Sequence, residues 1–355
     1  MTPRDIAPLR IASQCIGGTT RSVAALVEHM GALQAQDYNG ALWSIGLRTG
    51  LTQRQVIAAI EKQQIVRTWP QRGTIHFVPA RDAAWHVALT AERLIRGASA
   101  RRARLGLTDV VLAQCRTLLT NALEGGAILT RAAIMQLLEK NGVSTQGGRG
   151  YHILWHLSQT GVLVMGPMQG SEQSFTLLAE WVPNPHVLTR SEGIAELAKR
   201  YFVSHGPATL KDFMWWSGLT SVDAKAGVLA NHTVLISEKV DGKVCWMKKG
   251  IVPRDTEQSA YLLPGFDEYM LGYQDRSAAL PLAHTNRIVP GGNGMFLSTI
   301  VIDGQVVGTW KKEIKKERVI ITLNPFTALT KKDRQRLDVP AKQYGTFLGL
   351  DGVVG

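Results

Sequence analysis

The sequence predicts an α+β fold in which tandem winged-helix motifs are followed by a small C-terminal β-barrel. A plan of three short helices and a hairpin recurs three times before about residue 255, and strand-like segments dominate from about Ala260. Asp241-Gly242 and Asp303-Gly304 are typical of tight two-residue hairpin turns. Three helices followed by a hairpin form the winged-helix plan, a helix-turn-helix with a β wing.

The first copy of this plan begins with an amphipathic segment, Thr20–Leu33, whose apolar residues recur at helical spacing. A helix near Ala41–Leu47, a helix over Thr52–Lys62 and a wing around Ile65–Val78 follow. The arginine-rich segment Arg93–Arg104 is expected to be a solvated linker to the second copy.

The second and third copies repeat the order of helices and strands. In the second copy we expect helices over Leu107–Leu123, Thr130–Lys140 and Gly150–Gln159, and wing strands Val162–Met165 and Ser174–Leu178 around a Gly-Pro-Met-Gln-Gly turn. In the third we expect helices over Ser191–Val203, Leu210–Trp216 and Ser221–Ala230, and wing strands Thr233–Ser237 and Lys243–Lys248.

The C-terminal part is expected to form the barrel from strands Tyr261–Leu263, Gly294–Ile302, Gln305–Trp310 and Arg318–Leu323. The sequence therefore predicts four parts. They are a first winged helix at 1–92, a basic linker and second winged helix at 93–183, a third winged helix at 184–255 and the β-barrel at 256–355.

Composition and charge narrow the class of protein. Hydrophobic residues make up 45% of the 355 residues, which excludes a disordered chain. No apolar stretch predicts a membrane helix or a secretory signal, and three scattered cysteines favour a reducing cytoplasm. The formal charge of +12 indicates an anionic partner, most often nucleic acid, although a merely basic surface is the alternative.

Three patterns that could carry metal or acid–base chemistry have simpler structural interpretations. His152 and His156 have metal-ligand spacing on a helix, but packing or a DNA-facing role is favoured. Asp303 followed by Glu313-Ile314-Lys315 resembles a metal-nuclease spacing, but an Asp-Gly turn explains the aspartate. Asp267-Glu268 would point to opposite faces of a strand, which favours a structural role. We therefore expect no metal and no cofactor.

A polar cluster after the first amphipathic helix contains Gln34, Gln36, Asp37 and Asn39. Such side chains could orient water or ligand atoms by hydrogen bonds. On a continuing helix Gln34 and Asp37 would share a face, whereas Gln34 and Gln36 would do so only in non-helical backbone. The residues alone favour a capped helix end over a functional site.

The chain resembles the AlkZ/YcaQ family of winged-helix DNA glycosylases over nearly its whole length. The landmarks that carry the resemblance are Leu33–Asp37, Gln71–His76, Trp215–Leu219, Leu263–Tyr269 with Gly272-Tyr273, and Asp303–Trp310. The AlkZ branch has a catalytic Gln-apolar-Gln motif, which falls on Gln34-Ala35-Gln36. The other branch has Gln-x-Asp, and Asp37 lies one position too late for it, so the AlkZ-like branch is favoured and Asp37 has at most a secondary role.

The resemblance implies a monofunctional enzyme that excises N7-alkylated purines from double-stranded DNA, and it leaves open whether interstrand crosslinks are opened. A cationic base is already a good leaving group, so two neutral glutamines suffice to place water and to stabilise oxocarbenium character. The partner would be DNA carrying alkylated bases, bound by a monomer without a membrane. The expected phosphate contacts are Arg93, Arg96, Arg101, Arg102, Arg104, Lys239, Lys243, Lys248 and Lys249.

The rival interpretation is a non-catalytic winged-helix DNA-binding regulator. Regulators usually bind two-fold sites as dimers, whereas three wings and a barrel in one chain favour a monomer around DNA.

Overall fold

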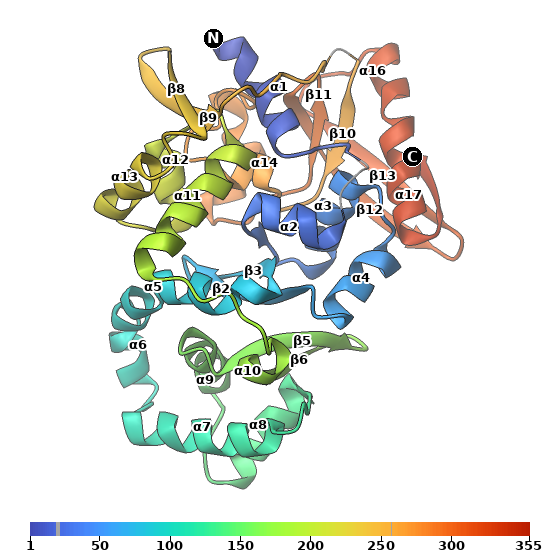
Figure 1. Cartoon of the computed structure of the whole chain (residues 1–355). Helices are drawn as coiled ribbons and strands as arrows, with labels where there is room; N and C mark the ends of the chain where they lie inside the picture. The colour runs from blue at the N-terminus through green and yellow to red at the C-terminus, as the bar shows by residue number, and fades with distance from the viewer. Residues whose placement is uncertain (19–21, 257) are drawn as a thin grey trace. The chain divides into compact units, whose positions relative to one another are not determined.

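The computed structural model describes residues 1–18, 22–256 and 258–355 and has an α+β fold (Figure 1). Its contacts divide the chain into two compact units. Unit 1 comprises residues 1–56 and 194–355, and unit 2 comprises residues 57–193. The four-part division by motif remains a prediction. The first two residues of the expected helix Thr20–Leu33 lie outside the described residues.

Unit 2 joins two hairpins into one sheet that is covered by helices. Its strands are β2 (Ile65–Gln71), β3 (Thr74–Pro79), β4 (Leu129–Thr130), β5 (Leu163–Gln169) and β6 (Glu172–Leu177), in the order β3-β2-β5-β6-β4. The helices are α5 (Ala83–Gly97), α6 (Ser99–Arg104), α7 (Asp109–Leu123), α8 (Arg131–Lys140), α9 (Arg149–Gln159) and α10 (Leu178–Trp181), with a 3-10 turn η1 (Ala80–Asp82). The two hairpins meet where Arg67 on β2 pairs with Met165 on β5.

Threonine caps explain where the helices of unit 2 begin. The side chain of Thr108 accepts a hydrogen bond from the backbone N–H of Val111, and Thr130 does the same for Ala133. Each threonine thereby satisfies one N–H that the first helical turn leaves without a partner. The predicted starts of α7 and α8 are therefore confirmed to within two residues.

Two predictions in unit 2 are wrong. The expected turn at residues 166–170 is instead the second half of β5, which continues to Gln169 with an irregularity between Met165 and Met168. A bulge tolerates the proline at position 167, so the turn forms at Gly170-Ser171. Arg93–Arg104 is not a linker but part of helices α5 and α6, because alanine, leucine and arginine are strong helix formers.

Both sequence segments of unit 1, residues 1–56 and 194–355, contain helices. The first helices are α1 (Pro3–Ser13), α2 (Val23–Met30), α3 (Tyr38–Thr49) and α4 (Gln53–Glu61), with the two-residue strand β1 (Leu33–Gln34) between α2 and α3. The later helices are α11 (Arg190–His205), α12 (Leu210–Ser217) and α13 (Ser221–Leu229). Helices α4 and α11 each cross a boundary of unit 1.

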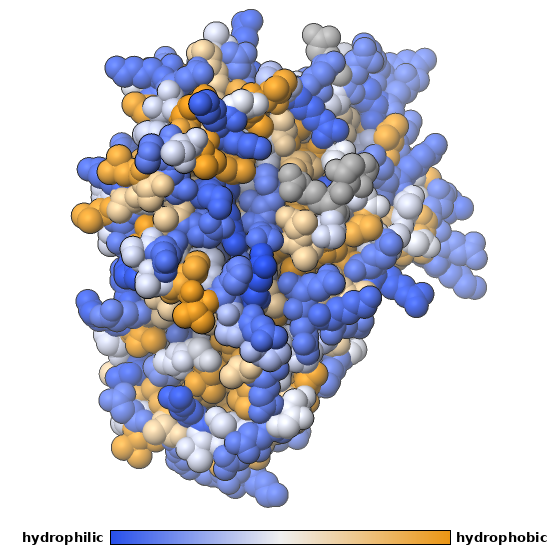
Figure 2. All heavy atoms as spheres, in the orientation of Figure 1, coloured by the Kyte–Doolittle hydropathy of each residue, from blue (hydrophilic) through white to orange (hydrophobic). Residues whose placement is uncertain are grey.

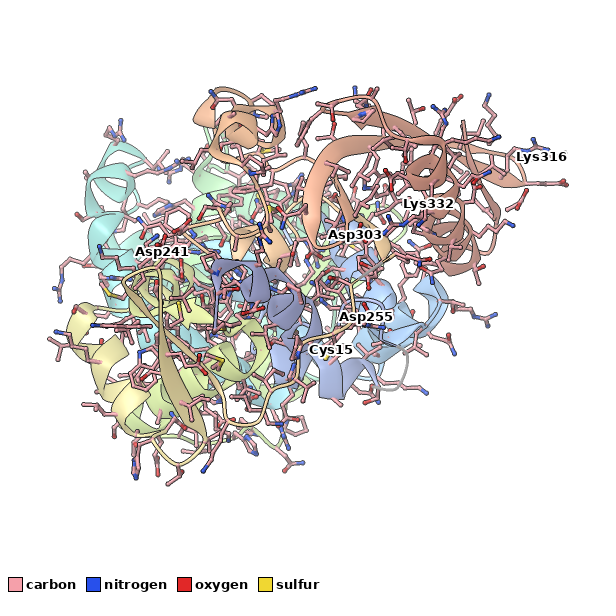
Figure 3. All side chains as sticks on the ribbon, turned by 90° about the horizontal axis from the view of Figure 1, so that it is seen from above. Cys15, Asp241, Asp255, Asp303, Lys316 and Lys332 are labelled. Atoms are coloured by element: carbon pink, nitrogen blue, oxygen red, sulfur yellow. The ribbon has the colours of Figure 1, made fainter. Side chains whose placement is uncertain are left out.

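A three-stranded sheet with the order β7-β9-β8 is interleaved with helices α11 to α13, since β7 lies between α11 and α12 and the other two strands follow α13. Its strands are β7 (Ala208–Thr209), β8 (Leu235–Val240) and β9 (Lys243–Lys248). Asp241 and Gly242 both have positive φ, 50° and 77°, as a type I′ turn requires. The hairpin is confirmed, although its first strand lies closer to the turn than the expected Thr233–Ser237. Asp241 marks its tip in Figure 3.

The C-terminal sheet is a curled half-barrel with the strand order β10-β11-β12-β13-β14, and its neighbours pair antiparallel except for β13 and β14. Its strands are β10 (Ala260–Leu263), β11 (Thr299–Ile302), β12 (Gln305–Lys315), β13 (Arg318–Pro325) and β14 (Asp351–Val354). The expected strand Gly294–Ile302 is too long, since β11 begins only at Thr299 and Gly294 has a φ of 77° that strand backbone does not adopt. In Figure 2 hydrophilic side chains surround the tip of β12 and β13, where Lys316 is labelled in Figure 3.

Short helices connect the strands of this sheet, and a longer one packs on it. They are α14 (Glu268–Leu271), η2 (Leu282–His284), α15 (Thr285–Ile288), η3 (Pro290–Gly292), α16 (Lys331–Arg336) and α17 (Asp338–Leu348). Tyr344 of α17 packs edge-on against Trp43 of α3 and Trp310 of β12, with ring centroids 4.9 and 5.3 Å apart. This aromatic cluster joins α3 to the C-terminal sheet. Within the described part of the chain, every helix is too short or too polar to span a bilayer.

Candidate active site

The segment between α2 and α3 carries the predicted glutamine pair. Helix α2 ends at Met30 because Gly31 has a φ of 77°, and a Cβ at Gly31 would lie only 3.3 Å from the Cβ of Arg200. Gln34 then lies in extended β1 and Gln36 in the bend that follows it. The helix-face relation expected for Gln34 and Asp37 is therefore wrong, because the helix has already ended.

The two glutamines differ in exposure. Gln34 is 8% exposed, whereas Gln36 is exposed. Asp37, also exposed, is the N-cap of α3, and its carboxylate accepts a hydrogen bond from the backbone N–H of Gly40 at 3.1 Å. The segment between the two helices is thus short, ordered at both ends and partly open to solvent.

The segment between α2 and α3 is hydrogen-bonded to the buried carboxylate of Glu268. Its Oε1 accepts a hydrogen bond from the backbone N–H of Gln34 at 2.9 Å. Its Oε2 accepts one from the indole Nε1 of Trp216 at 2.9 Å and lies 3.4 Å from Nε2 of His205. Glu268 is 1% exposed, so these contacts replace hydration of the carboxylate.

Aromatic rings hold the two partners of Glu268 in place. Tyr201 stacks on His205 with centroids 4.7 Å apart, and Trp216 packs against both rings. Burial lowers the pKa of His205, and the hydrogen bond and charge of Glu268 oppose that effect only in part. His205 is therefore neutral at pH 7.

Asp267, the neighbour of Glu268, anchors the same loop to α3. Two guanidinium nitrogens of Arg48 each donate a hydrogen bond to a different Asp267 oxygen at 2.8 Å, and Ser44 donates a third. Burial disfavours the Arg48 charge, but the Asp267 carboxylate more than compensates, and the net effect raises the pKa of Arg48. Because both acids lie at the start of short helix α14, the expected strand geometry with opposite faces is wrong.

A small polar pocket lies next to the N-terminus of α3. Its volume is about 80 Å³, and it is lined by residues that include Asp37, Asn39, Lys311, Lys312 and Tyr344. The ammonium of Lys312 donates a hydrogen bond to the Tyr344 hydroxyl at 2.7 Å. A cavity of this size and polarity has room for ordered water.

The arginines expected to contact phosphates lie on two helices of unit 2. Arg93 and Arg96 lie on α5, and Arg101, Arg102 and Arg104 lie on α6. Arg102 pairs with Asp109 at 3.2 Å and is half-buried, whereas the other four are exposed. Their spacing is therefore helical rather than that of a flexible linker.

The expected lysines lie on the β8–β9 hairpin of unit 1. Lys239, Lys248 and Lys249 are exposed. Lys243 is also exposed, but its ammonium pairs with Asp275 at 2.6 Å, and this hydrogen bond raises its pKa. The Asp275 carboxylate therefore neutralises part of the positive charge of Lys243.

Residues of the two sequence patterns that resembled metal sites contact other side chains of the protein. Asp303 has a φ of 52° in its turn and pairs with Arg336, as the conformational interpretation predicts. The ring of His152 packs on Trp155 with centroids 5.0 Å apart, and burial lowers the pKa of both His152 and His156. Packing is the favoured interpretation of this pair.

The comparisons with known proteins cover almost the entire chain. The family model described as DNA glycosylase AlkZ-like matches residues 27–347. The chain belongs to the AlkZ-like DNA glycosylase family. It is 26% identical over 345 residues to an interstrand DNA cross-link repair glycosylase from Streptomyces sahachiroi, covering 91% of this chain and 88% of that protein. It also matches the solved structure of Streptomyces sahachiroi DNA glycosylase AlkZ with a TM-score of 0.82 and 22% identity, over 100% of this chain and 99% of the other.

The AlkZ-like family establishes this chain as a DNA glycosylase, and its substrate is DNA. The comparisons give no support to the regulator. The AlkZ-like landmark Leu263–Tyr269 contains Glu268, which sequence reasoning assigned a structural role only. Its position in that landmark was the one signal of its link to the glutamine segment, because the two lie 234 residues apart.

Proposed function

We propose that this DNA glycosylase hydrolyses the N-glycosidic bond of N7-alkylated purines in double-stranded DNA, with Gln34 and Gln36 as its catalytic residues. The observation that carries the proposal is the backbone of this pair. The chain leaves helical geometry between α2 and α3, is extended at Gln34 and bends at Gln36, and it is anchored at Gln34 by a buried carboxylate, while Gln36 is exposed.

The chemistry suits neutral side chains. Water attacks C1′ of the damaged nucleotide as the bond from C1′ to N9 breaks, and the electron pair of that bond neutralises the cationic base. The attacking water releases one proton to the solvent, so an abasic site and a neutral alkylpurine result. Amide oxygens of Gln34 and Gln36 can orient the water and stabilise positive charge at C1′.

The proposed substrates extend to purines in interstrand crosslinks. The Streptomyces sahachiroi relative is named for repair of such crosslinks, and a crosslinked N7-alkylpurine carries the same positive charge as a simple adduct. The leaving-group argument therefore applies to both.

DNA binding is proposed to use the winged-helix motifs and the exposed basic residues on α5, on α6 and on the β8–β9 hairpin. The net charge of +12 supports a large share of phosphate contacts, which position a repair enzyme without reading sequence. We further propose that the enzyme acts as a monomer in the cytoplasm.

Single-turnover excision tests the catalytic assignment. DNA with one N7-methylguanine is incubated with excess enzyme, and abasic sites are revealed by alkaline cleavage. Gln34→Ala and Gln36→Ala are each expected to lower the maximal rate about 10²-fold, the usual effect of losing one preorganised polar group, with little change in DNA affinity.

Gln335→Ala, at an exposed position on α16, is the matched control and should keep the wild-type rate. DNA containing an uncharged base such as hypoxanthine should not be processed, because its departure needs acid assistance. Wild-type rates in both site variants would remove the assignment of the glutamine pair. Efficient release of hypoxanthine would contradict the substrate class.

A further inference from the structure

We propose that Glu268 is a positioning residue for base excision, because its carboxylate fixes the backbone of Gln34 and thereby the geometry of the Gln34–Gln36 pair. This inference rests on the proposed catalytic role of that pair. It assigns a function to a buried acid that touches neither substrate nor water in the proposed reaction.

The contact acts on the part of Gln34 that determines where its side chain points. The Glu268 oxygen accepts from the peptide N–H of Gln34, so it restrains the backbone torsions beside the Gln34 Cα atom. Gly31 and the N-cap Asp37 restrain the two ends of the same segment. The middle of the segment therefore depends on Glu268.

The surroundings of Glu268 require an acceptor at both carboxylate oxygens. Oε1 faces the N–H of Gln34, while Oε2 faces the N–H of Trp216. An ionised carboxylate is the side-chain group that accepts at both positions, whereas an amide has one acceptor and one donor end. An apolar residue here would leave both buried N–H groups without an acceptor, so the isosteric amide is the change that tests the carboxylate itself.

One positive charge and one neutral ring help to bury this acid. The guanidinium of Arg48 interacts electrostatically with Glu268 as well as with Asp267. Neutral His205 is adjustable, because either of its ring nitrogens can carry the proton. It can therefore donate to a carboxylate or accept from an amide.

The test compares Glu268→Gln with Glu268→Gln combined with Trp216→Phe. In Glu268→Gln the amide NH₂ must face the N–H of either Gln34 or Trp216, so the glutamine segment shifts. We expect the maximal single-turnover rate to fall about 10- to 100-fold, as for a small misplacement of reacting groups, while the affinity for lesion DNA stays the same.

Adding Trp216→Phe removes the competing donor. The amide oxygen can then accept from Gln34, and its NH₂ can donate to His205. The double variant should recover at least about tenfold in rate over Glu268→Gln, although it has lost more packing. A purely structural role for Glu268 predicts instead that the excision rate follows the melting temperature in every variant, Ser217→Ala included.

Ser217→Ala is the matched control for stability. Ser217 is buried next to Trp216, and its hydroxyl bonds to the carbonyl of Phe213 without touching Glu268. This variant should melt at a lower temperature and keep the wild-type rate.

Three results would overturn the inference: a wild-type rate in Glu268→Gln, a double variant no faster than Glu268→Gln, or an equal slowing in Ser217→Ala. Where Glu268→Gln does not fold, the double variant decides alone, and a rate more than 100-fold below wild type overturns the inference. Failure of the glutamine assignment is separate, because it appears as full activity in Gln34→Ala and Gln36→Ala.

Discussion

Asp267→Asn removes one charge from the buried ion pair that fastens the loop before α14 to helix α3. The side chains of Arg48 and Asp267 are 0% and 1% exposed, and their two hydrogen bonds measure 2.8 Å each. Asp267 also accepts from the Ser44 hydroxyl and from the backbone N–H of Tyr269. The carboxylate thus serves four donors at once.

The expected loss follows from the charge that is left behind. Asparagine can accept from some of these donors but turns an NH₂ towards others, and Arg48 loses the carboxylate that it contacts directly and keeps only the electrostatic attraction of Glu268. Breaking one partner of a buried pair costs about 3–5 kcal/mol. Arg48 keeps its hydrogen bonds to Gln14, so we expect the lower end, about 3 kcal/mol.

Urea unfolding followed by circular dichroism and tryptophan fluorescence measures the effect. Asp303→Asn is the matched control, because Asp303 also pairs with an arginine, Arg336, but its side chain is 49% exposed. That variant should lose less than about 1 kcal/mol. Equal losses in the two variants would refute the reasoning that burial determines the energetic effect of these pairs.

Three further predictions concern the cap, the arginines and the buried histidine. Asp37→Asn should keep most of the excision of cationic adducts, because asparagine also caps helices; a folded, DNA-binding variant without activity would indicate carboxylate-driven chemistry. Reversing Arg101 and Arg102 to Glu should weaken binding to two unrelated duplexes alike and flatten the slope of log K against log salt by about 0.9 per lost phosphate contact, as measured by anisotropy. A strong preference for one undamaged duplex with a shallow slope would contradict this and favour the regulator. Stability should fall as the pH drops below about 6.5, because the unfolded chain takes up a proton that buried His205 resists in the folded state. An unfolding free energy that is unchanged between pH 7 and 5.5 would contradict this prediction.

Local signals in the sequence predicted most helices and hairpins, because neighbouring residues specify them. Asp241-Gly242 adopts the positive φ angles that its turn demands. Thr108 and Thr130 cap helices that begin within two residues of the expected positions. Where two local signals competed, as around Gly166 and Gly170, pairing with the neighbouring strand decided which glycine formed the turn.

The sequence indicated which residues form the candidate site, whereas the tertiary structure determined how they are arranged. The polar residues Gln34, Gln36 and Asp37 could be selected from the sequence, and their match to the family motif suggested roles. Their backbone geometry could not be, because helical periodicity continued through Leu33 while Gly31 ended the helix at Met30. The close approach of Arg200 at Gly31 is a tertiary contact across the chain.

The sequence by itself determined the class of fold, the basic character of the chain and the glutamine motif, since these follow from composition and from residues within a few positions of one another. Only the tertiary structure decided what supports that motif. Gln34 and Glu268 are 234 residues apart, and Arg48 and Asp267 are 219 apart. No short-range pattern encodes such contacts, because they form when packing buries carboxylates that must then find donors.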